Sequence, residues 1–436
     1  MVQGPAQDPH VRRLPESLLN PALRRPLLWG LILGAAFLLR AGYAWHAWSG
    51  GAVQFNNDEY ETIARQIVSR GNYYFLKPEV PGADQEPGVP TAAREPGFPF
   101  FIAAVYLLCG VHPFAVLIVQ CLLGAATCGL VGLLARRLAG ERAGLIAAAL
   151  TAFYPYGVYY CAFFLRETLV CFLFSAALLL LLRFLDEPRP AAALAAGLVS
   201  GLCAVTFSSW LLITGALALA AAGLALRRAR LAAALLLAAW ALFPGAWTLR
   251  NYAVFGRFIP GSTLAGFNFY TALIVPEDLR GTPREIEIEQ ADPKWSAAQG
   301  LLPYYLMDDG RQQEAFMKAA KEHIRAHPGQ YLAHVVRQAA KLWRFYPYPR
   351  QYPHSYRLIK TASLLSDGWL IPLGLLGLVL FWRRSGDARF YAIVLLLGTG
   401  VYALVSAIVR YRLPMMLPLI ALSAATLAKA WERRRA

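Results

Sequence analysis

Charged residues are scarce in this sequence, and their scarcity sets the class of protein. Asp, Glu, Lys and Arg make up 16% of the 436 residues, whereas hydrophobic residues make up 57%. Leu and Ala run in long blocks such as LVCFLFSAALLLLL at 169–182. A mean hydropathy of +0.42 with so little charge excludes a soluble domain. The composition predicts an all-α polytopic membrane protein.

Motifs of nucleotide and metal chemistry are also missing. The sequence has neither the glycine loop of a Walker motif nor that of a Rossmann fold. His323 and His327 have the i, i+4 spacing of metal ligands, but no third ligand is evident. No cofactor is predicted, and a divalent metal is left open because the sequence does not indicate one. The six cysteines lie in apolar stretches without CxxC spacing, which predicts neither disulfides nor a zinc site: Cys109, Cys121, Cys128, Cys161, Cys171 and Cys203.

Ten apolar segments approach the roughly 20 residues that cross a bilayer as a helix. A further run, Phe98–Cys109, has only about a dozen residues, so we expect a re-entrant or surface-lying helix there. The ten predicted spans are Leu27–Trp48, Pro113–Leu134, Ala143–Tyr160, Leu165–Leu182, Ala191–Thr206, Trp210–Leu226, Leu231–Thr248, Ala362–Phe381, Phe390–Ile408 and Pro414–Ala430.

The cations set the orientation. The formal net charge of +16 would suggest nucleic acid in a soluble chain, but here Lys and Arg cluster in short gaps between apolar runs. Each short loop on the side of the termini is basic, for example ARRLAGER at 135–142. By the positive-inside rule that side is cytoplasmic, and no nucleic acid partner is predicted. The predicted organisation is a cytoplasmic tail (1–26) and one transmembrane domain (27–436), with extracytoplasmic loops at 49–112 and 249–361.

The first outer loop opens with an acidic pair, Asp58 and Glu59. From Tyr60 the apolar residues follow the i, i+3, i+4, i+7 pattern of a one-faced helix, which is typical of a helix in the membrane interface. Two interpretations of Asp58 follow. Either Asn57 or Asp58 is the N-cap of this helix, or Asp58 has a chemical role.

Cations recur on the same outer side, where the positive-inside rule disfavours them. Each one alone is typical of a snorkelling anchor for lipid headgroups. Together with carboxylates they indicate transfer from a phosphorylated lipid, because a phosphate needs cations and an acceptor needs a carboxylate base. These residues are Arg94 before Pro96-Gly97, Arg166 beside Glu167 at the end of the fourth span, Arg250 at the end of the seventh, and Arg410 and Arg412 between the last two.

The second outer loop contains two amphipathic helices that break at Pro328-Gly329. In the second helix, Leu332 and Val336 belong to a predicted apolar face. A basic stripe on another face is expected to contact anionic headgroups; pyrophosphate or an acidic glycan is the alternative. The stripe consists of His334, Arg337, Lys341 and Arg344.

The order of these segments resembles bacterial type C glycosyltransferases, in the protein O-mannosyltransferase and aminoarabinose transferase-like branch. The shared features are the acidic pair after the first span, R-E-P-G-x-P at 94–99, a Glu after a YP-containing span, W-x-x-R-N-Y at 247–252 and R-Y-R-x-P-x-x-x-P at 410–418. The resemblance implies an inverting enzyme of the bacterial plasma membrane, which uses a polyprenyl-phosphate sugar at an extracytoplasmic active site.

The resemblance also implies roles for individual residues. Asp58 matches the family's catalytic acidic residue, with Glu59 beside it, and Glu167 matches an acidic residue at the fourth span. Arg94 and Arg250 match cations that bind the donor phosphate. The chain departs from the family after the fifth span, where VTFSSWLL replaces a frequent Arg-Pro. Further phosphate-binding candidates are Arg166, Arg410 and Arg412, with Lys341 and Arg344 as secondary candidates.

Two other functions stay open at this point. An O-antigen polymerase or ligase also has many spans and a large late outer loop, but it needs no carboxylate after the first span. A lipid-linked sugar transporter or flippase predicts charged residues near the bilayer midplane, and almost none is evident. The sequence names neither the donor sugar nor the acceptor, which is a glycan, a lipid or a protein.

The predicted orientation can be tested by labelling single introduced cysteines from outside the cell. We expect labelling at Gly82 and Ala297, in the outer loops, and none at Ala229 or Gly386, in the basic loops. The parent chain without an introduced cysteine is the control for background labelling. Labelling at Gly386 would contradict the ten-span topology.

Overall fold

The computed structural model describes residues 21–51, 53, 59–75, 89–276, 279–280, 282–300, 310–348 and 356–435. Within these residues, eight helices are long and apolar enough to cross a membrane. The long helices are α1 (Pro21–Ser49), α4 (Pro113–Ala152), α6 (Glu167–Asp186), α8 (Ser208–Ala225), α9 (Arg230–Phe255), α15 (Tyr356–Phe381), α16 (Gly386–Leu404) and α17 (Leu413–Arg433). The predicted all-α polytopic fold is confirmed.

Helix α4 accounts for two of the predicted spans. Its 40 residues bend back at Ala139 and Gly140. The φ of Gly140 is 75°, which residues with a side chain rarely adopt. Gly132 and Gly144 then face each other, since a Cβ on Gly132 would lie 2.9 Å from the carbonyl oxygen of Gly144. The two arms are therefore antiparallel. The second arm ends at Ala152, earlier than predicted, because Pro155 starts a separate short helix, α5 (Pro155–Tyr159), followed by η2 (Tyr160–Ala162).

Helix α7 (Pro190–Ala204) has 15 residues, fewer than the roughly 20 that span a bilayer. It packs closely on α9 through a pair of glycines four residues apart. A Cβ on Gly197 would lie 2.5 Å from the carbonyl oxygen of Leu236, and one on Gly201 would lie 2.4 Å from that of Trp240. Small residues at this spacing let helix backbones approach in a membrane. Each of the ten predicted segments thus overlaps a helix, although several extend beyond the helix and α7 is short for a crossing.

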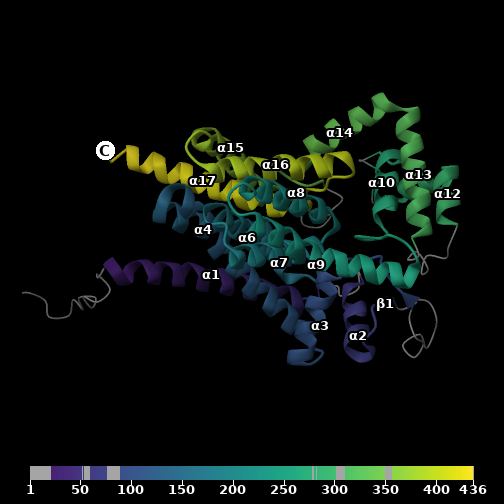
Figure 1. Cartoon of the computed structure of the whole chain (residues 1–436), viewed down its shortest axis with the longest axis horizontal. Helices are drawn as coiled ribbons and strands as arrows, with labels where there is room; N and C mark the ends of the chain where they lie inside the picture. Colours follow the sequence, from purple (N-terminus) through teal and green to yellow (C-terminus); the bar gives the residue numbers. More distant parts are fainter. Residues whose placement is uncertain are drawn as a thin grey trace, which may run out of the picture.

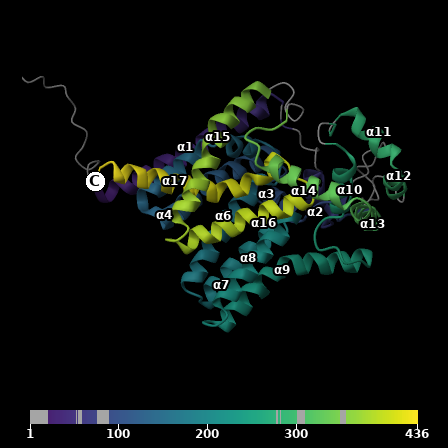
Figure 2. The same cartoon turned by 90° about the horizontal axis from the view of Figure 1, so that it is seen from above.

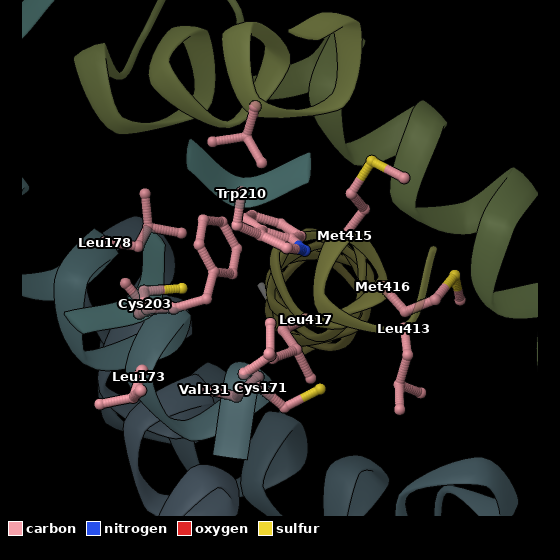
Figure 3. Packing of buried hydrophobic residues seen from close by; sticks show 14 of the residues in the cluster. Val131, Cys171, Leu173, Leu178, Cys203, Trp210, Leu413, Met415, Met416 and Leu417 are labelled. Atoms are coloured by element: carbon pink, nitrogen blue, oxygen red, sulfur yellow. The ribbon is translucent and has the colours of Figure 1, made fainter. Parts of the chain in front are cut away.

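Helix α17 forms the centre of the bundle. It packs against α4, α6, α15 and α16, and its side chains from Leu413 to Thr426 are buried. Figure 3 shows Trp210 and Cys171, from neighbouring helices, close to this helix, on which Met415 and Leu417 lie. Trp210 is fully buried and its ring lies 4.5 Å from that of Phe174. The largest apolar core therefore lies within the bundle.

The two ends of the bundle differ. The start of α1 and the end of α17 lie at one end, and α10 (Ala265–Ile274), α12 (Pro293–Gln299) and α13 (Arg311–Ala326) lie at the other (Figure 1). At the end with the termini, Arg137 is 2.7 Å from both Asp186 and Asp387, so it joins three of the short loops. This arrangement agrees with the predicted placement of both termini on one side.

The opposite end carries the short elements. Helix α2 (Tyr60–Arg70) packs against α3 (Gly97–Cys109), and β1 (Tyr74–Phe75) pairs antiparallel with β2 (Val89–Pro90). Further along the chain, α10 and α13 pack around Phe316, and α14 returns to α16 (Figure 2). These later helices are α10 (Ala265–Ile274), α11 (Pro283–Ala291), α12 (Pro293–Gln299), α13 (Arg311–Ala326) and α14 (Pro328–Leu342), and η5 (Val409–Arg412) precedes α17.

Helix α2 confirms the predicted apolar face and adds a polar contact. Tyr60, Ile63 and Ala64 are buried, as the pattern predicts. Glu61 lies outside the apolar pattern but is 5% exposed, and it accepts hydrogen bonds from Tyr106 (2.9 Å) and Arg65 (2.5 Å). This polar contact fixes α2 on α3, and α2 carries Glu59 at its start.

Candidate functional site

The site is built around the segment Arg94-Glu95-Pro96-Gly97, which leads into α3. Gly97 lies against the junction between α7 and α8, since a Cβ there would be 2.8 Å from the Cα of Thr206. The backbone N–H of Gly97 donates to the carbonyl of Val205 at 2.9 Å. Any larger residue at 97 would displace this turn, so glycine is required for the close approach.

Glu95 is the hub of the site, and sequence reasoning did not single it out. Its carboxylate accepts from the Arg166 guanidinium at 2.5 Å and from the backbone N–H of Ser208 at 2.8 Å. The hydroxyl of Ser208 also donates to it. The Glu95 side chain is 5% exposed and that of Arg166 is 13% exposed, so both charges are removed from water and depend on each other. The available signal was an acidic residue in the turn before an apolar helix.

Aromatic rings extend this arrangement towards η5. The guanidinium of Arg166 lies 3.7 Å from the ring centre of Phe207, a cation–π contact. Phe207 packs against Tyr411 with 5.2 Å between ring centres, and Tyr411 stacks on Tyr402 at 5.2 Å. Phe207 thus packs on the guanidinium of Arg166 and helps to orient it.

Two further ion pairs lie at the ends of helices around this hub. Arg94 is 3.8 Å from Glu59, and Arg410 is 3.5 Å from Glu167. The side chains of Arg94 and Arg410 are 20% and 31% exposed, more than that of Arg166. Glu167 is 5% exposed, and its Oε2 atom makes no hydrogen bond within the described part of the chain. We name the set Glu59, Arg94, Glu95, Arg166, Glu167 and Arg410 the polar cluster.

Four helices begin at the polar cluster. Arg166 directly precedes α6, and Glu95 lies two residues before α3. The first residue of α8 donates its N–H to Glu95. Helix α2 begins after Glu59. Free N–H groups and the positive ends of helix dipoles favour anions at such positions. The arrangement therefore suits an anionic group, such as a phosphate, beside the more exposed guanidinium groups.

Glu59 has an unusual backbone. Its φ of 61° places it in the left-handed region, and among the described residues it is the one non-glycine residue with positive φ. It is the N-cap of α2 but makes no capping hydrogen bond with its side chain. The prediction of Asn57 or Asp58 as the N-cap is therefore wrong. Strained backbones of this kind cost about 1–3 kcal/mol and cluster at functional sites. Asp58 itself lies outside the described residues.

Arg250 lies next to the polar cluster rather than within it. It donates to the carbonyls of Thr91 (2.7 Å) and Tyr73 (3.1 Å), and so holds the two chain segments that form β1 and β2. The hydroxyl of Tyr73 in turn donates to the carbonyl of Arg94 at 3.0 Å. Burial and the nearby Glu95 raise the pKa of Tyr73 well above its ordinary value, which keeps this hydroxyl protonated. In this structure Arg250 supports the segment that carries Arg94.

Arg412 also has internal partners. It is 1% exposed, pairs with the buried Asp367, and donates to the carbonyls of Leu342 (2.8 Å) and Arg344. Asp367 accepts a second hydrogen bond from Tyr154 at 2.8 Å. Arg412 therefore joins α15 to the end of α14, and its guanidinium faces these groups rather than the polar cluster.

Arg40 is a charged residue inside the first predicted span, Leu27–Trp48. It is 1% exposed and donates to the carbonyls of Ala152 and Thr151, at 2.9 and 3.0 Å, where the second arm of α4 ends. A cation at a helix C-terminus satisfies carbonyls that lack helical partners. The prediction of almost no charge near the bilayer midplane did not take account of Arg40, which lies towards the middle of its predicted span. A lone charge in an apolar run was the available signal, since such a charge needs an internal partner.

The predicted break between the two late amphipathic helices is confirmed, but α14 is turned differently from the prediction. His334 and Lys341, from the basic stripe, are each 5% exposed, whereas Leu332 and Val336 are 66% and 62% exposed. The ring of His334 is 3.1 Å from the carbonyl of Val405. Burial lowers the pKa of His334, and the positive charges of Arg337, Arg280 and Lys341 lower it further. The ring is therefore neutral near pH 7, and its N–H donates to the carbonyl of Val405. The side chain of Arg344 stacks on Tyr348 at 3.8 Å.

The predicted histidine pair lies on α13 and its end. The rings of His323 and His327 are 5.2 Å apart, and burial followed by the proximity of His327 lowers the pKa of His323. Among the residues that the structure describes, no three His, Cys, Asp or Glu side chains gather as a metal site.

The dependence of the site on Glu95 can be measured as stability. Glu95→Gln keeps the shape of the side chain but leaves the buried charge of Arg166 without its counter-ion, which typically costs about 3–5 kcal/mol. We expect a clearly lower unfolding temperature in detergent. The control is Glu187→Gln, because Glu187 pairs with Arg189 at 3.0 Å on the surface, where such pairs contribute about 0–1 kcal/mol. Equal losses in the two variants would contradict the role of Glu95.

Comparisons with known proteins place this geometry in context. Residues 89–247 match the family model of dolichyl-phosphate-mannose-protein mannosyltransferases. This range contains Arg94, Glu95, Arg166 and Glu167. A search of the curated proteins found no match.

Solved structures resemble the whole chain. The archaeal oligosaccharyltransferase AglB from Archaeoglobus fulgidus, in complex with an inhibitory peptide and a dolichol-phosphate, is 16% identical with a TM-score of 0.54. The alignment covers 94% of this chain and 51% of AglB. A crystal structure of the Archaeoglobus fulgidus oligosaccharyltransferase with Zn and sulfate is 16% identical, with a TM-score of 0.54 and coverage of 94% and 49%. ArnT from Cupriavidus metallidurans, bound to undecaprenyl phosphate, is 15% identical, with a TM-score of 0.40 and coverage of 95% and 79%.

The present chain thus spans about half the length of the Archaeoglobus enzyme. The assignment of the fold depends on the two Archaeoglobus structures, and the family match adds the segment of the polar cluster. The predicted resemblance agrees with these findings: the chain has the fold of the Archaeoglobus oligosaccharyltransferase, and residues 89–247 match the family model of dolichyl-phosphate-mannose-protein mannosyltransferases.

Proposed function

We propose that this chain is an inverting glycosyltransferase, which moves a sugar from a polyprenyl-phosphate donor to an acceptor. The observation that carries the proposal is the polar cluster, in which the pairs Glu59–Arg94 and Glu167–Arg410 meet at the bundle end opposite the termini. A lipid phosphate reaches such a position while its tail stays in the bilayer. The dolichol-phosphate in the AglB structure supports a donor of this class. We further propose that this end is extracytoplasmic and the membrane is a bacterial plasma membrane.

The donor phosphate is proposed to bind Arg94 and Arg410. Their ion pairs are longer than hydrogen bonds and their side chains are partly exposed, so a phosphate can replace or join the carboxylate partners. Arg166 lies behind them, bound to Glu95. The helix ends at α2, α3, α6 and α8 add favourable dipoles for the charge that the phosphate gains on leaving. Arg250 assists by holding the segment before Arg94.

Asp58 is proposed as the general base. It removes the proton from the acceptor hydroxyl or amine, whose oxygen or nitrogen forms a bond to the anomeric carbon of the sugar. The bond between that carbon and the phosphate oxygen breaks on the opposite face, and polyprenyl phosphate leaves with the electron pair. A single displacement of this kind inverts the anomeric carbon. Glu59 stands beside the base, and the buried Glu167 is the other carboxylate of the site.

The alternatives have less support. A polymerase or ligase needs no carboxylates at this end, yet two of them pair with arginines there. A transporter needs intramembrane charges that can change partners, whereas Arg40 caps a helix and Arg412 is bound to Asp367 within the described structure.

Asp58→Asn tests the proposed base. The amide keeps the size of the side chain but cannot take a proton, and loss of a general base typically lowers the rate about 100- to 10,000-fold. We expect a folded variant that binds polyprenyl phosphate normally and transfers sugar at a rate reduced by this factor. The matched control is Asp292→Asn, since Asp292 caps α12 by accepting from the N–H of Trp295 and Asn caps equally well. Turnover of Asp58→Asn within a few-fold of the parent would show that Asp58 is not the base.

A further inference from the structure

One side of α3 is apolar and exposed. Phe100, Leu107 and Leu108 are 51%, 69% and 86% exposed, and Ala104 between them is exposed as well. Their spacing of i, i+4, i+7 and i+8 places these residues on one side of the helix. The helix contains no charged residue, so this side presents apolar side chains only. We name Phe100, Ala104, Leu107 and Leu108 the outer face of α3.

The other side of α3 is packed within the protein. The ring of Phe98 meets that of Tyr60 edge to face, with 5.1 Å between ring centres, and the hydroxyl of Tyr106 donates to Glu61 at 2.9 Å. Both contacts join α3 to α2. They involve buried residues of α3, so the outer face is the part of the helix that this packing leaves exposed.

The outer face ends next to a side of α1 that has the pattern of a lipid-facing surface. Leu31, Leu38 and Trp45 recur every seven residues along this predicted span, and all three are exposed. The ring of Trp45 contacts that of Phe114, at the start of α4, with 5.6 Å between ring centres. The chain reaches Phe114 directly after α3. The bilayer that covers this side of α1 therefore extends to the end of α3.

The length of α3 excludes a crossing of that bilayer. Its 13 residues rise about 20 Å, whereas the hydrocarbon core is roughly 30 Å thick. Two arrangements remain for an apolar helix of this length. Either it is re-entrant, with one end near the bilayer centre, or it lies along the membrane surface at one depth.

A neighbouring arginine favours the surface arrangement. The guanidinium of Arg65 lies 6.0 Å from the ring centre of Tyr106, in the last turn of α3, and the Arg65 side chain is 49% exposed. An exposed guanidinium is costly in hydrocarbon and belongs at the headgroups. The other end of α3 begins at Gly97, next to the polar cluster. Both ends of the helix thus have charged groups beside them.

We propose that α3 lies along the membrane surface on the side of the polar cluster, with its outer face in contact with the acyl chains of that leaflet. The partner of this surface is lipid, and the contact does not depend on the proposed function. Its consequence for the donor does rest on that function. Because Arg94 and Glu95 directly precede α3, the helix holds them at the level of the lipid phosphates, where a polyprenyl phosphate binds with its tail in the bilayer.

The native Cys109 offers a direct test of this contact. It is exposed at the end of α3, whereas the other five cysteines are buried. The full-length protein is labelled there with a fluorophore in detergent and transferred to phosphatidylcholine nanodiscs. We expect a nitroxide near the headgroup end of the acyl chains to quench it at least about twofold more than one near the methyl end, since such helices reach about 5–10 Å below the headgroups. Iodide in the water should quench it weakly.

Two variants in a Cys109→Ser background calibrate the measurement. Lys318→Cys, on the exposed side of α13, should be quenched by iodide. Leu396→Cys, 72% exposed in the middle of α16, should be quenched most by the nitroxide near the methyl end.

Three results at Cys109 would overturn the inference. Quenching by iodide as strong as that of Lys318→Cys would place the outer face in water. Stronger quenching by the deep nitroxide would make α3 re-entrant. Protection from iodide and from both nitroxides would assign the face to a second protein or another copy of this chain. Absence of sugar transfer by the parent would contradict the proposed function and would leave the lipid contact of Cys109 unchanged.

Discussion

The geometry of this site depends on one buried interaction, the binding of Arg166 and the first N–H of α8 by the carboxylate of Glu95. The three groups come from separate parts of the chain, and apolar packing alone would not orient them. Because both charges are largely removed from water, each requires the other. The turn that carries Glu95 also carries Arg94, so the same interaction places a proposed phosphate ligand.

The division of the arginines into two kinds follows from this arrangement. Three arginines donate hydrogen bonds to internal carboxylates and carbonyls and so hold chain segments together: Arg166, Arg250 and Arg412. Arg94 and Arg410 are more exposed and have looser ion pairs. A ligand phosphate competes for the second kind far more readily, since the first kind would leave a buried acceptor without a partner.

The sequence was sufficient for the helices and for the basic and acidic segments, because membrane thickness and 3.6-residue periodicity are local rules. It identified Arg94, Arg166, Glu167 and Arg410, which the structure brings together. Three features needed tertiary information. The rotation of α14 depends on its contact with Val405 and Ala407, and the partners of Arg412 depend on three distant elements. Glu95 lay within a recognised motif, but its role depends on Ser208, more than a hundred residues away.

The central claim is that the polar cluster binds the phosphate of a lipid-linked donor. Its most direct test is the affinity of the purified protein for undecaprenyl phosphate in nanodiscs, measured for the parent and for Arg94→Gln/Arg410→Gln. The control is Arg389→Gln, an exposed cation of α16 near the opposite end of the bundle. The account predicts at least tenfold weaker binding in the double variant and no change in the control. Binding within twofold of the parent in the folded double variant would contradict it.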